Sequence, residues 1–340
     1  MKRSASDLEL TPGKGPRRPT PAARRVQVLA LSGGGYRGLY SAHLLANIEQ
    51  HYKGTSVSRQ FDLIIGTSTG ALIATALALG VPPATIVEKF ITHGPNIFAG
   101  SRGRTAQARK ALVSSPYKAQ PLREAILDTI GPENAKATLA DVSAPLAVCA
   151  VNFTHGRTEI FRSKGLAKRN ASRTTVVDAV MASAAAPTYF PAHQVGVETF
   201  IDGGIVANAP DLQGIVEAQT YVTRTLADVY LLAVGTAARR KGAPLVAVGA
   251  ASTMSWLLSH DLYDATLAAQ EQLARTQAAA VLGERYYLLN REPLENQVAD
   301  ISGLDVVTPE STKTLISLAD ETWADVKKDQ RLRRFFNVAA

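Results

Sequence analysis

Two apolar runs, each followed by a glycine-rich loop and then by a stretch with helical spacing, organise the first part of the chain. The first run is Val26–Leu31, and after its glycines the apolar residues recur with a helical period up to Gly54. The second run is Phe61–Ile65, and the Ala- and Leu-rich stretch after it ends at Gly80, before two prolines. Each unit therefore predicts a strand, a loop and a helix.

The same alternation continues along the rest of the chain. Further predicted strands are Leu146–Asn152, Thr158–Arg162, Val229–Gly235 and Arg285–Leu289. Helical patterns between several of them favour an α/β fold, with helices packed on a mostly parallel sheet. Thr308-Pro309 predicts the start of a last helix. Without repeats or a clear linker after residue 25, we expect a single domain over 26–340, whose C-terminal helical part begins at about residue 246.

One apolar stretch, residues 62–81, has the length of a transmembrane helix. It contains Asp62 and breaks at Gly66, so we interpret it as a strand and a helix and predict no membrane span. The 340 residues are 46% apolar and 19% charged, a globular composition that excludes disorder throughout. A single cysteine, Cys149, permits no internal disulfide, and residues 1–25 lack the apolar core of a signal peptide. We therefore expect a cytoplasmic protein.

Residues 1–25 differ in composition from the rest. They hold seven basic residues, two acids and four prolines, a balance of +5 within the net +8 of the chain. Such a segment buries too little apolar surface to offset its ordering entropy, so we predict a disordered tail. It either binds an anionic partner such as lipid headgroups or stays solvated without one.

A glycine-rich loop, Ser32–Gly38, follows the first predicted strand. It fits the G-x-G-x-x-G pattern of dinucleotide-binding sites, but the acid that would hold the ribose is missing from the end of the second predicted strand. Successive amides without side chains near a helix N-terminus favour negative charge. The loop therefore predicts an anion site, for a phosphate or for an oxyanion.

The segment Gly66-Thr67-Ser68-Thr69-Gly70 ends the second predicted strand and opens a helix, the setting of a nucleophile elbow. In an ordinary loop Ser68 would be only a helix N-cap. A serine hydroxyl needs a base to become a nucleophile. One candidate is Asp202, in a triplet with Gly203 and Gly204 that alone indicates a hairpin turn. The other candidates are His93, His155, His193 and His260.

Four motifs, in this order, resemble the patatin-like phospholipase family: Gly33–Gly38, the Gly66–Gly70 elbow, Ala182–Pro191, and Asp202-Gly203-Gly204. The resemblance runs from about Val26 to Leu289. It implies a three-layer α/β/α fold and a catalytic dyad of Ser68 and Asp202 without histidine. It also implies that the amides of Gly33, Gly34 and Gly35 hold an oxyanion, that Arg37 supports their loop, and that no metal or cofactor takes part.

Within this family the stretch Leu31–Tyr40, with Ser32 before the glycines, is most similar to the CapV-type effectors of bacterial CBASS antiphage systems. That similarity implies hydrolysis of membrane glycerophospholipids from the cytoplasmic side of the membrane. It implies activation by a cyclic dinucleotide such as cyclic GMP-AMP and no DNA or RNA partner, and it leaves a homo-oligomer open. The alternatives are a constitutive patatin-like lipase, a dinucleotide-binding oxidoreductase, and a catalytically silent nucleotide- or membrane-binding protein.

Charge patterning adds three hypotheses. Basic residues cluster without acids from Lys89 to Arg123, and again from Arg157 to Arg173 with Glu159 as the one acid. Either cluster could bind the phosphates of lipid headgroups or of a nucleotide. The alternative for any single residue is a solvated helix face. Arg102–Lys110 is a hypothetical cap over the active site. The basic C-terminus with Phe335 and Phe336 is either a membrane anchor or a helix end whose aromatic rings dock on the body.

Overall fold

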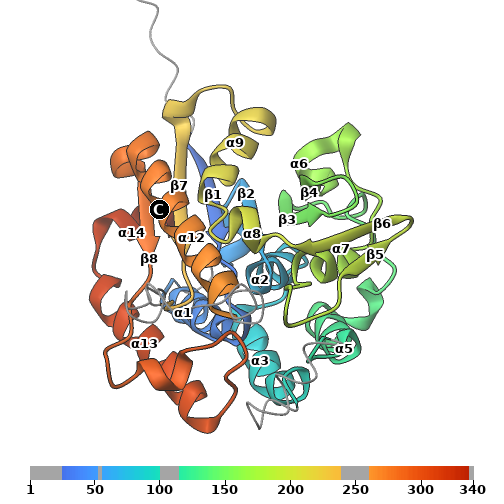
Figure 1. Cartoon of the computed structure of the whole chain (residues 1–340). Helices are drawn as coiled ribbons and strands as arrows, with labels where there is room; N and C mark the ends of the chain where they lie inside the picture. The colour runs from blue at the N-terminus through green and yellow to red at the C-terminus, as the bar shows by residue number, and fades with distance from the viewer. Residues whose placement is uncertain (1–24, 53–55, 100–114, 239–259, 337–340) are drawn as a thin grey trace, which may run out of the picture.

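A computed structural model of the chain describes residues 25–52, 56–99, 115–238 and 260–336. These residues form one eight-stranded sheet with the order β5-β6-β3-β2-β1-β7-β8 and with β4 beside β3 (Figure 1). The strands are β1 (Val26–Leu31), β2 (Leu63–Thr67), β3 (Leu146–Asn152), β4 (Arg157–Arg162), β5 (His193–Val195), β6 (Glu198–Asp202), β7 (Val229–Val234) and β8 (Tyr286–Leu289). The run from β3 to β8 is parallel, and β4, β5 and β6 pair in antiparallel fashion.

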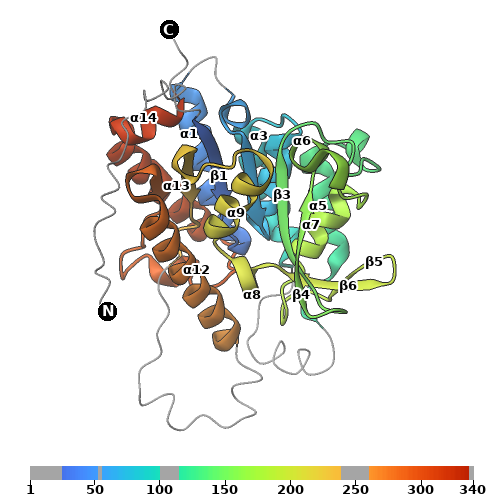
Figure 2. The ribbon, with the colours of Figure 1, turned by 90° about the horizontal axis from the view of Figure 1, so that it is seen from above.

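Helices cover both faces of this sheet (Figure 2). Their bounds are α1 (Gly38–His51), α2 (Thr69–Ala78), α3 (Pro83–Ile97), α5 (Ala119–Ile130), α6 (Lys164–Ala167), α7 (Val176–Ser183), α8 (Gly204–Ala207), α9 (Asp211–Tyr221), α12 (His260–Leu282), α13 (Pro309–Val326) and α14 (Gln330–Phe336). Alternate residues of β1 divide between two cores. Leu29 and Leu31 pack with α1, α2, α3, α5, α7 and α13, whereas Val28 and Ala30 pack with α9 and α12.

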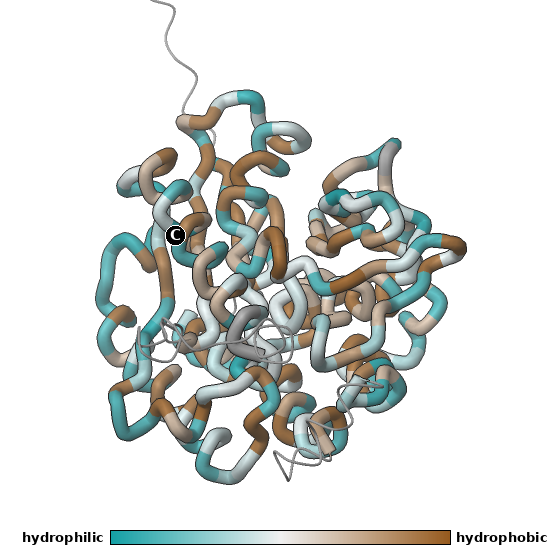
Figure 3. The backbone as a smooth tube through the Cα atoms, in the orientation of Figure 1, coloured by the Kyte–Doolittle hydropathy of each residue, from teal (hydrophilic) through white to brown (hydrophobic). Residues whose placement is uncertain are grey.

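This division makes a three-layer α/β/α fold, as expected. Hydrophobic residues are concentrated along the central strands, and hydrophilic segments lie at the periphery (Figure 3). The structure resolves the apolar stretch 62–81 into β2 and α2, because the chain turns sharply after Thr67. Among the described residues no helix is both long and apolar enough to cross a bilayer.

The predicted strands are found within two residues of their expected ends, while β5 and β6 were missed. Those two strands are short and carry polar residues on both faces, so they show no apolar run. At the C-terminal end Thr308 caps α13 through a reciprocal capping box with Ser311. The rings of Phe335 and Phe336 are buried, and Phe336 stacks on Tyr52 with ring centroids 5.0 Å apart. These two aromatic rings therefore dock on the body rather than face a membrane.

Pairing along β3 positions the site. Residues 147–152 pair with β4 on one edge of β3. The first half of β3 also pairs with β2, where Thr67 lies opposite Cys149, and the second half pairs with β6, where Asp202 lies opposite Ala150. Because β4 fills one edge, β2 and β6 must follow one another along the other edge. The register of β3 therefore brings the residue after Thr67 beside Asp202.

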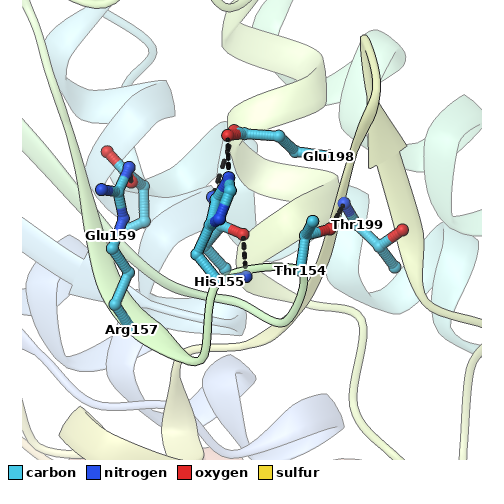
Figure 4. Close-up of polar contacts among 7 residues, drawn as sticks. Thr154, His155, Arg157, Glu159, Glu198 and Thr199 are labelled. Carbon is cyan, nitrogen blue, oxygen red and sulfur yellow. Dashed lines mark hydrogen bonds and ion pairs between the residues drawn. The ribbon is translucent and has the colours of Figure 1, made fainter.

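The β5–β6 hairpin that carries Asp202 is fastened to the turn between β3 and β4 (Figure 4). Nε2 of His155 and an oxygen of Glu198 are 2.9 Å apart, and the side-chain Nδ2 of Asn152 donates to the other Glu198 oxygen at 3.1 Å. The amide of Thr199 donates to the Thr154 hydroxyl at 2.8 Å. These contacts hold β6 in register with β3 at a point where β2 has ended.

Several residues of the two basic clusters are used in internal ion pairs. The pairs are Lys89 with Asp128 at 2.7 Å, Arg123 with Asp178 at 3.1 Å, and Arg162 with Glu217 at 2.6 Å. These three side chains hold elements together, so the expected anion-binding clusters are smaller than the sequence suggested. The tail up to residue 24 and the segment Arg102–Lys110 lie outside the described residues.

Candidate active site

Ser68 stands on a strained turn between β2 and α2. Its φ of 54° and ψ of −124° lie in a region that non-glycine residues rarely adopt. A Cβ on Gly66 would come within 2.2 Å of the Gly70 carbonyl oxygen, and one on Gly70 within 2.2 Å of the Leu31 carbonyl oxygen. Both glycines are therefore required by close backbone approach. This geometry is that of a nucleophile elbow, which presents a hydroxyl at the end of a strand.

Ser183, at the end of α7, links this elbow to the sheet. Its hydroxyl accepts the amide of Ser68 at 2.8 Å and donates to the Cys149 carbonyl at 2.6 Å. Two residues later the carbonyl of Ala185 accepts the amide of Asp202 at 3.0 Å. The segment Ala182–Pro191 therefore joins both ends of the expected dyad, a role that the sequence analysis did not assign to it.

Asp202 is buried, with 2% of its surface exposed, and forms a hydrogen bond with the Ser68 hydroxyl. Burial raises the pKa of this carboxyl from 3.8 to about 7, and hydrogen bonds from the Gly204 amide and from Ser68 lower the pKa in part. The Gly204 amide donates to Oδ1 of Asp202 at 2.6 Å. On Gly203, a Cβ would come within 2.2 Å of the Cys149 carbonyl oxygen. The structure thus brings together the two side chains expected to form the dyad.

The glycine loop faces the same place, but its three glycines are not equivalent. A Cβ built on Gly33 would lie 3.2 Å from Cβ of Ser68, so the loop is adjacent to the elbow. The Gly33 amide donates to the Asn208 carbonyl at 2.9 Å and is therefore not free for an oxyanion, contrary to expectation. Within the described part of the chain the amides of Gly34 and Gly35 have no hydrogen-bond acceptor. Gly35 has a φ of 59°, which favours glycine.

Asn208 supports this loop from the turn after α8. It is 3% exposed, and its side-chain amide donates to Glu271 at 3.2 Å. Glu271 also pairs with Arg275 one turn along α12. The backbone amide of Arg37 donates to the Gly34 carbonyl at 3.2 Å and closes the turn, whereas the role expected for the Arg37 side chain stays a prediction. Sequence reasoning missed Asn208 because nothing in its local pattern shows that it faces Gly33.

An apolar cavity opens beside Ser68, between α2, α3, α5 and α7. Leu72, Phe98 and Phe190 are among its lining side chains, and Gly35 of the loop borders it. Its other apolar lining residues include Phe90, Ile97, Leu122, Ala125, Ile126, Val180, Ala184, Ala186 and Leu304. A hydrocarbon chain attached to a group at Ser68 would bury its surface there.

The histidines considered as bases have other partners. Nε2 of His93 lies 2.7 Å from Asp128, that of His155 lies 2.9 Å from Glu198, and that of His193 lies 3.1 Å from Asp178. The side chain of His260 lies outside the described residues. Asp202 is therefore the one candidate base that the described structure places in contact with Ser68.

Comparison with known proteins agrees with this architecture. A family model described as patatin-like phospholipase matches residues 29–212. A cGAMP-activated phospholipase of Pseudomonas aeruginosa is 34% identical, over 85% of this chain and 85% of that protein. A second cGAMP-activated phospholipase, from Vibrio cholerae, is 29% identical over 93% of this chain and 96% of that protein. A cUMP-AMP-activated phospholipase of Escherichia coli is 29% identical over 62% of this chain and 64% of that protein. The chain belongs to the patatin-like phospholipase family.

Proposed function

We propose that this protein hydrolyses ester bonds of membrane glycerophospholipids, with Ser68 as nucleophile and Asp202 as base. The observation that supports the proposal most directly is the hydrogen bond between a hydroxyl on a strained elbow and a buried carboxyl whose pKa is raised to about 7. An ordinary carboxylate is too weak a base at neutral pH, and burial corrects this mismatch.

The reaction proceeds in two halves. Oγ of Ser68 bonds to the ester carbonyl carbon while its proton passes to Asp202, and the amides of Gly34 and Gly35 donate to the oxyanion. The carbon–oxygen bond to the leaving alcohol then breaks, and Asp202 returns the proton to that alcohol, which leaves an acyl-serine. Water then gives a proton to Asp202 and attacks the acyl carbon. The bond from that carbon to Oγ of Ser68 breaks, Asp202 returns the proton to Oγ, and the fatty acid is released. Each oxyanion donor contributes about 3–4 kcal/mol to transition-state stabilisation.

The cavity beside Ser68 supports a lipid rather than a small polar ester. Its lining is almost wholly apolar, so an acyl chain gains about 0.8 kcal/mol for each methylene that it buries. The substrate class implies that the enzyme works peripherally, at the cytoplasmic face of the membrane.

We further propose that a cyclic dinucleotide switches the enzyme on. Two relatives that cover most of this chain are named cGAMP-activated phospholipases, and a third is named for cUMP-AMP. Cyclic GMP-AMP is therefore the first activator to test, and the uridine analogue is the second. The favoured biological role is antiphage defence.

Hydrolysis of phosphatidylglycerol and phosphatidylethanolamine vesicles tests the proposal, with and without each cyclic dinucleotide. Wild-type protein is expected to release fatty acid only with an activator, and Ser68→Ala is expected to release none. A fluorophosphonate probe should label the wild type and not Ser68→Ala. Equal hydrolysis with and without nucleotides would favour a constitutive lipase, and no labelling under any condition would exclude an activated serine.

A further inference from the structure

The apolar cavity beside Ser68 is bordered by two basic side chains of α3, which pair with an acid of α5. Lys89 and His93, which lie one turn apart on α3, both line the cavity. Nζ of Lys89 and Nε2 of His93 each lie 2.7 Å from the same Asp128 oxygen on α5. We call Lys89, His93 and Asp128 the α3–α5 clasp. Charged groups are costly against apolar surface unless they are paired, and here each has a partner.

The clasp joins α3 to α5 across one side of the cavity, and Ser68 borders another side. The catalytic end is marked by Ala184 and Ala186, since the Ala185 carbonyl between them accepts the Asp202 amide at 3.0 Å. Phe98 follows the last turn of α3 and packs on Phe190 there, with ring centroids 6.0 Å apart. The lining extends from Lys89 to Ile97 along α3 and from Leu122 to Thr129 along α5, roughly 10–12 Å by helix rise.

We propose that the α3–α5 clasp closes the acyl cavity on the side between these two helices and limits the length of the acyl chain that the enzyme accepts. The inference rests on the proposed ester hydrolysis at Ser68. Asp128 is 48% exposed and Lys89 is 28% exposed, so the clasp separates the apolar lining from solvent. A chain too long for the cavity has to displace the paired charges or leave its last methylenes in water. Removal of the clasp lets such a chain continue between α3 and α5.

Asp128→Ala removes the shared partner of both basic side chains, and because the Asp128 side chain is 48% exposed we expect the variant to fold. The matched control is Glu124→Ala, one turn earlier on α5, because Glu124 is exposed and accepts a hydrogen bond from Gln120 of the same helix. A second variant, Lys89→Met, keeps the apolar stem and removes one charge. All three are compared with the full-length wild type, with activator present.

The measurement is kcat/KM for a series of p-nitrophenyl esters from butyrate to palmitate in mixed micelles. We expect the optimum of Asp128→Ala to move to longer chains, with about a fourfold gain in kcat/KM for each additional methylene that becomes buried. Lys89→Met should shift the optimum in the same direction by less, and Glu124→Ala should reproduce the wild-type profile.

The outcomes separate this inference from the proposed function. If wild type hydrolyses the esters and the profile of Asp128→Ala matches that of Glu124→Ala, the clasp does not limit chain length. A shift of Asp128→Ala toward shorter chains would equally overturn the inference. Absence of Ser68-dependent hydrolysis for every ester would instead refute the proposed function.

Discussion

Replacement of Asp202 by asparagine should raise the stability of the protein at alkaline pH while abolishing its activity. The carboxyl is buried and its pKa is raised to about 7, chiefly by burial. Asparagine is nearly isosteric but cannot ionise. It therefore removes both the base that activates Ser68 and the cost of a charge in an apolar environment.

The magnitude follows from the two pKa values. A carboxyl that ionises near 3.8 in the unfolded chain and near 7 in the folded protein costs roughly 4 kcal/mol more to ionise when folded. Between these pH values the folded state binds more protons than the unfolded state, so wild-type stability falls as pH rises from about 4 to about 7. Between about pH 5 and about pH 8 the stability of Asp202→Asn relative to wild type should therefore rise by roughly 2–3 kcal/mol.

Urea unfolding of the two proteins at both pH values measures this difference. Other titrating groups are common to both proteins and cancel in the comparison. Ser68→Ala is the control, because it is also inactive yet keeps the buried carboxyl. Loss of the Ser68 hydrogen bond raises the pKa of Asp202 further, so the stability of this variant relative to wild type should not rise with pH. If the free energies of unfolding of Asp202→Asn and wild type differed by the same amount at both pH values, burial would not raise the pKa of Asp202 and the reasoning would be refuted.

Three further outcomes are expected. Hydrolysis of a soluble ester should increase with pH along a limb with an apparent pKa of about 7, because only ionised Asp202 accepts the Ser68 proton; a flat profile from about pH 5 to about pH 9 would contradict this. Ser183→Ala leaves the Ser68 amide and the Cys149 carbonyl without their partner, so urea unfolding should show a loss of about 1–3 kcal/mol, together with slower turnover. Gly34→Ala places a Cβ 2.5 Å from the Thr236 hydroxyl oxygen and so displaces a proposed oxyanion donor. We expect kcat to fall about 100-fold or more, and an unchanged kcat would exclude Gly34 from the oxyanion site.

Sequence patterns predicted those parts of the site that depend on local backbone geometry. The elbow could be identified because any other residue at position 66 or 70 would place its Cβ less than 3 Å from backbone atoms, so both positions require glycine. The central strands could be identified because burial on both faces produces continuous apolar runs. The constraint on Gly66 comes from its near neighbour Gly70, and the constraint on Gly70 comes from the distant Leu31 carbonyl, but each fixes a glycine at a set position in one short motif and so leaves a local trace.

The remaining features depend on contacts between distant segments. The Gly33 amide is consumed by the Asn208 carbonyl, 175 positions further along, so the sequence could not show which glycines keep a free amide. β5 and β6 were missed because the hairpin is held by β3 and by Glu198 contacts rather than by apolar patterning. The ion pairs of Lys89 and Arg123 with acids on other helices likewise could be found only from the three-dimensional structure.

The register of β3 also explains how the proposed dyad would work without a histidine. Thr67 lies opposite Cys149 and Asp202 lies opposite the next residue, Ala150, on the same edge of β3. A serine that follows Thr67 therefore meets the carboxyl directly, and in the proposed mechanism their hydrogen bond takes the place of the imidazole that usually stands between a nucleophile and an acid. What the imidazole contributes is a pKa near neutrality, and burial of Asp202 gives the carboxyl that same property. Any change that admits water to Asp202 without breaking its contact with Ser68 should thus weaken the base while the dyad geometry persists.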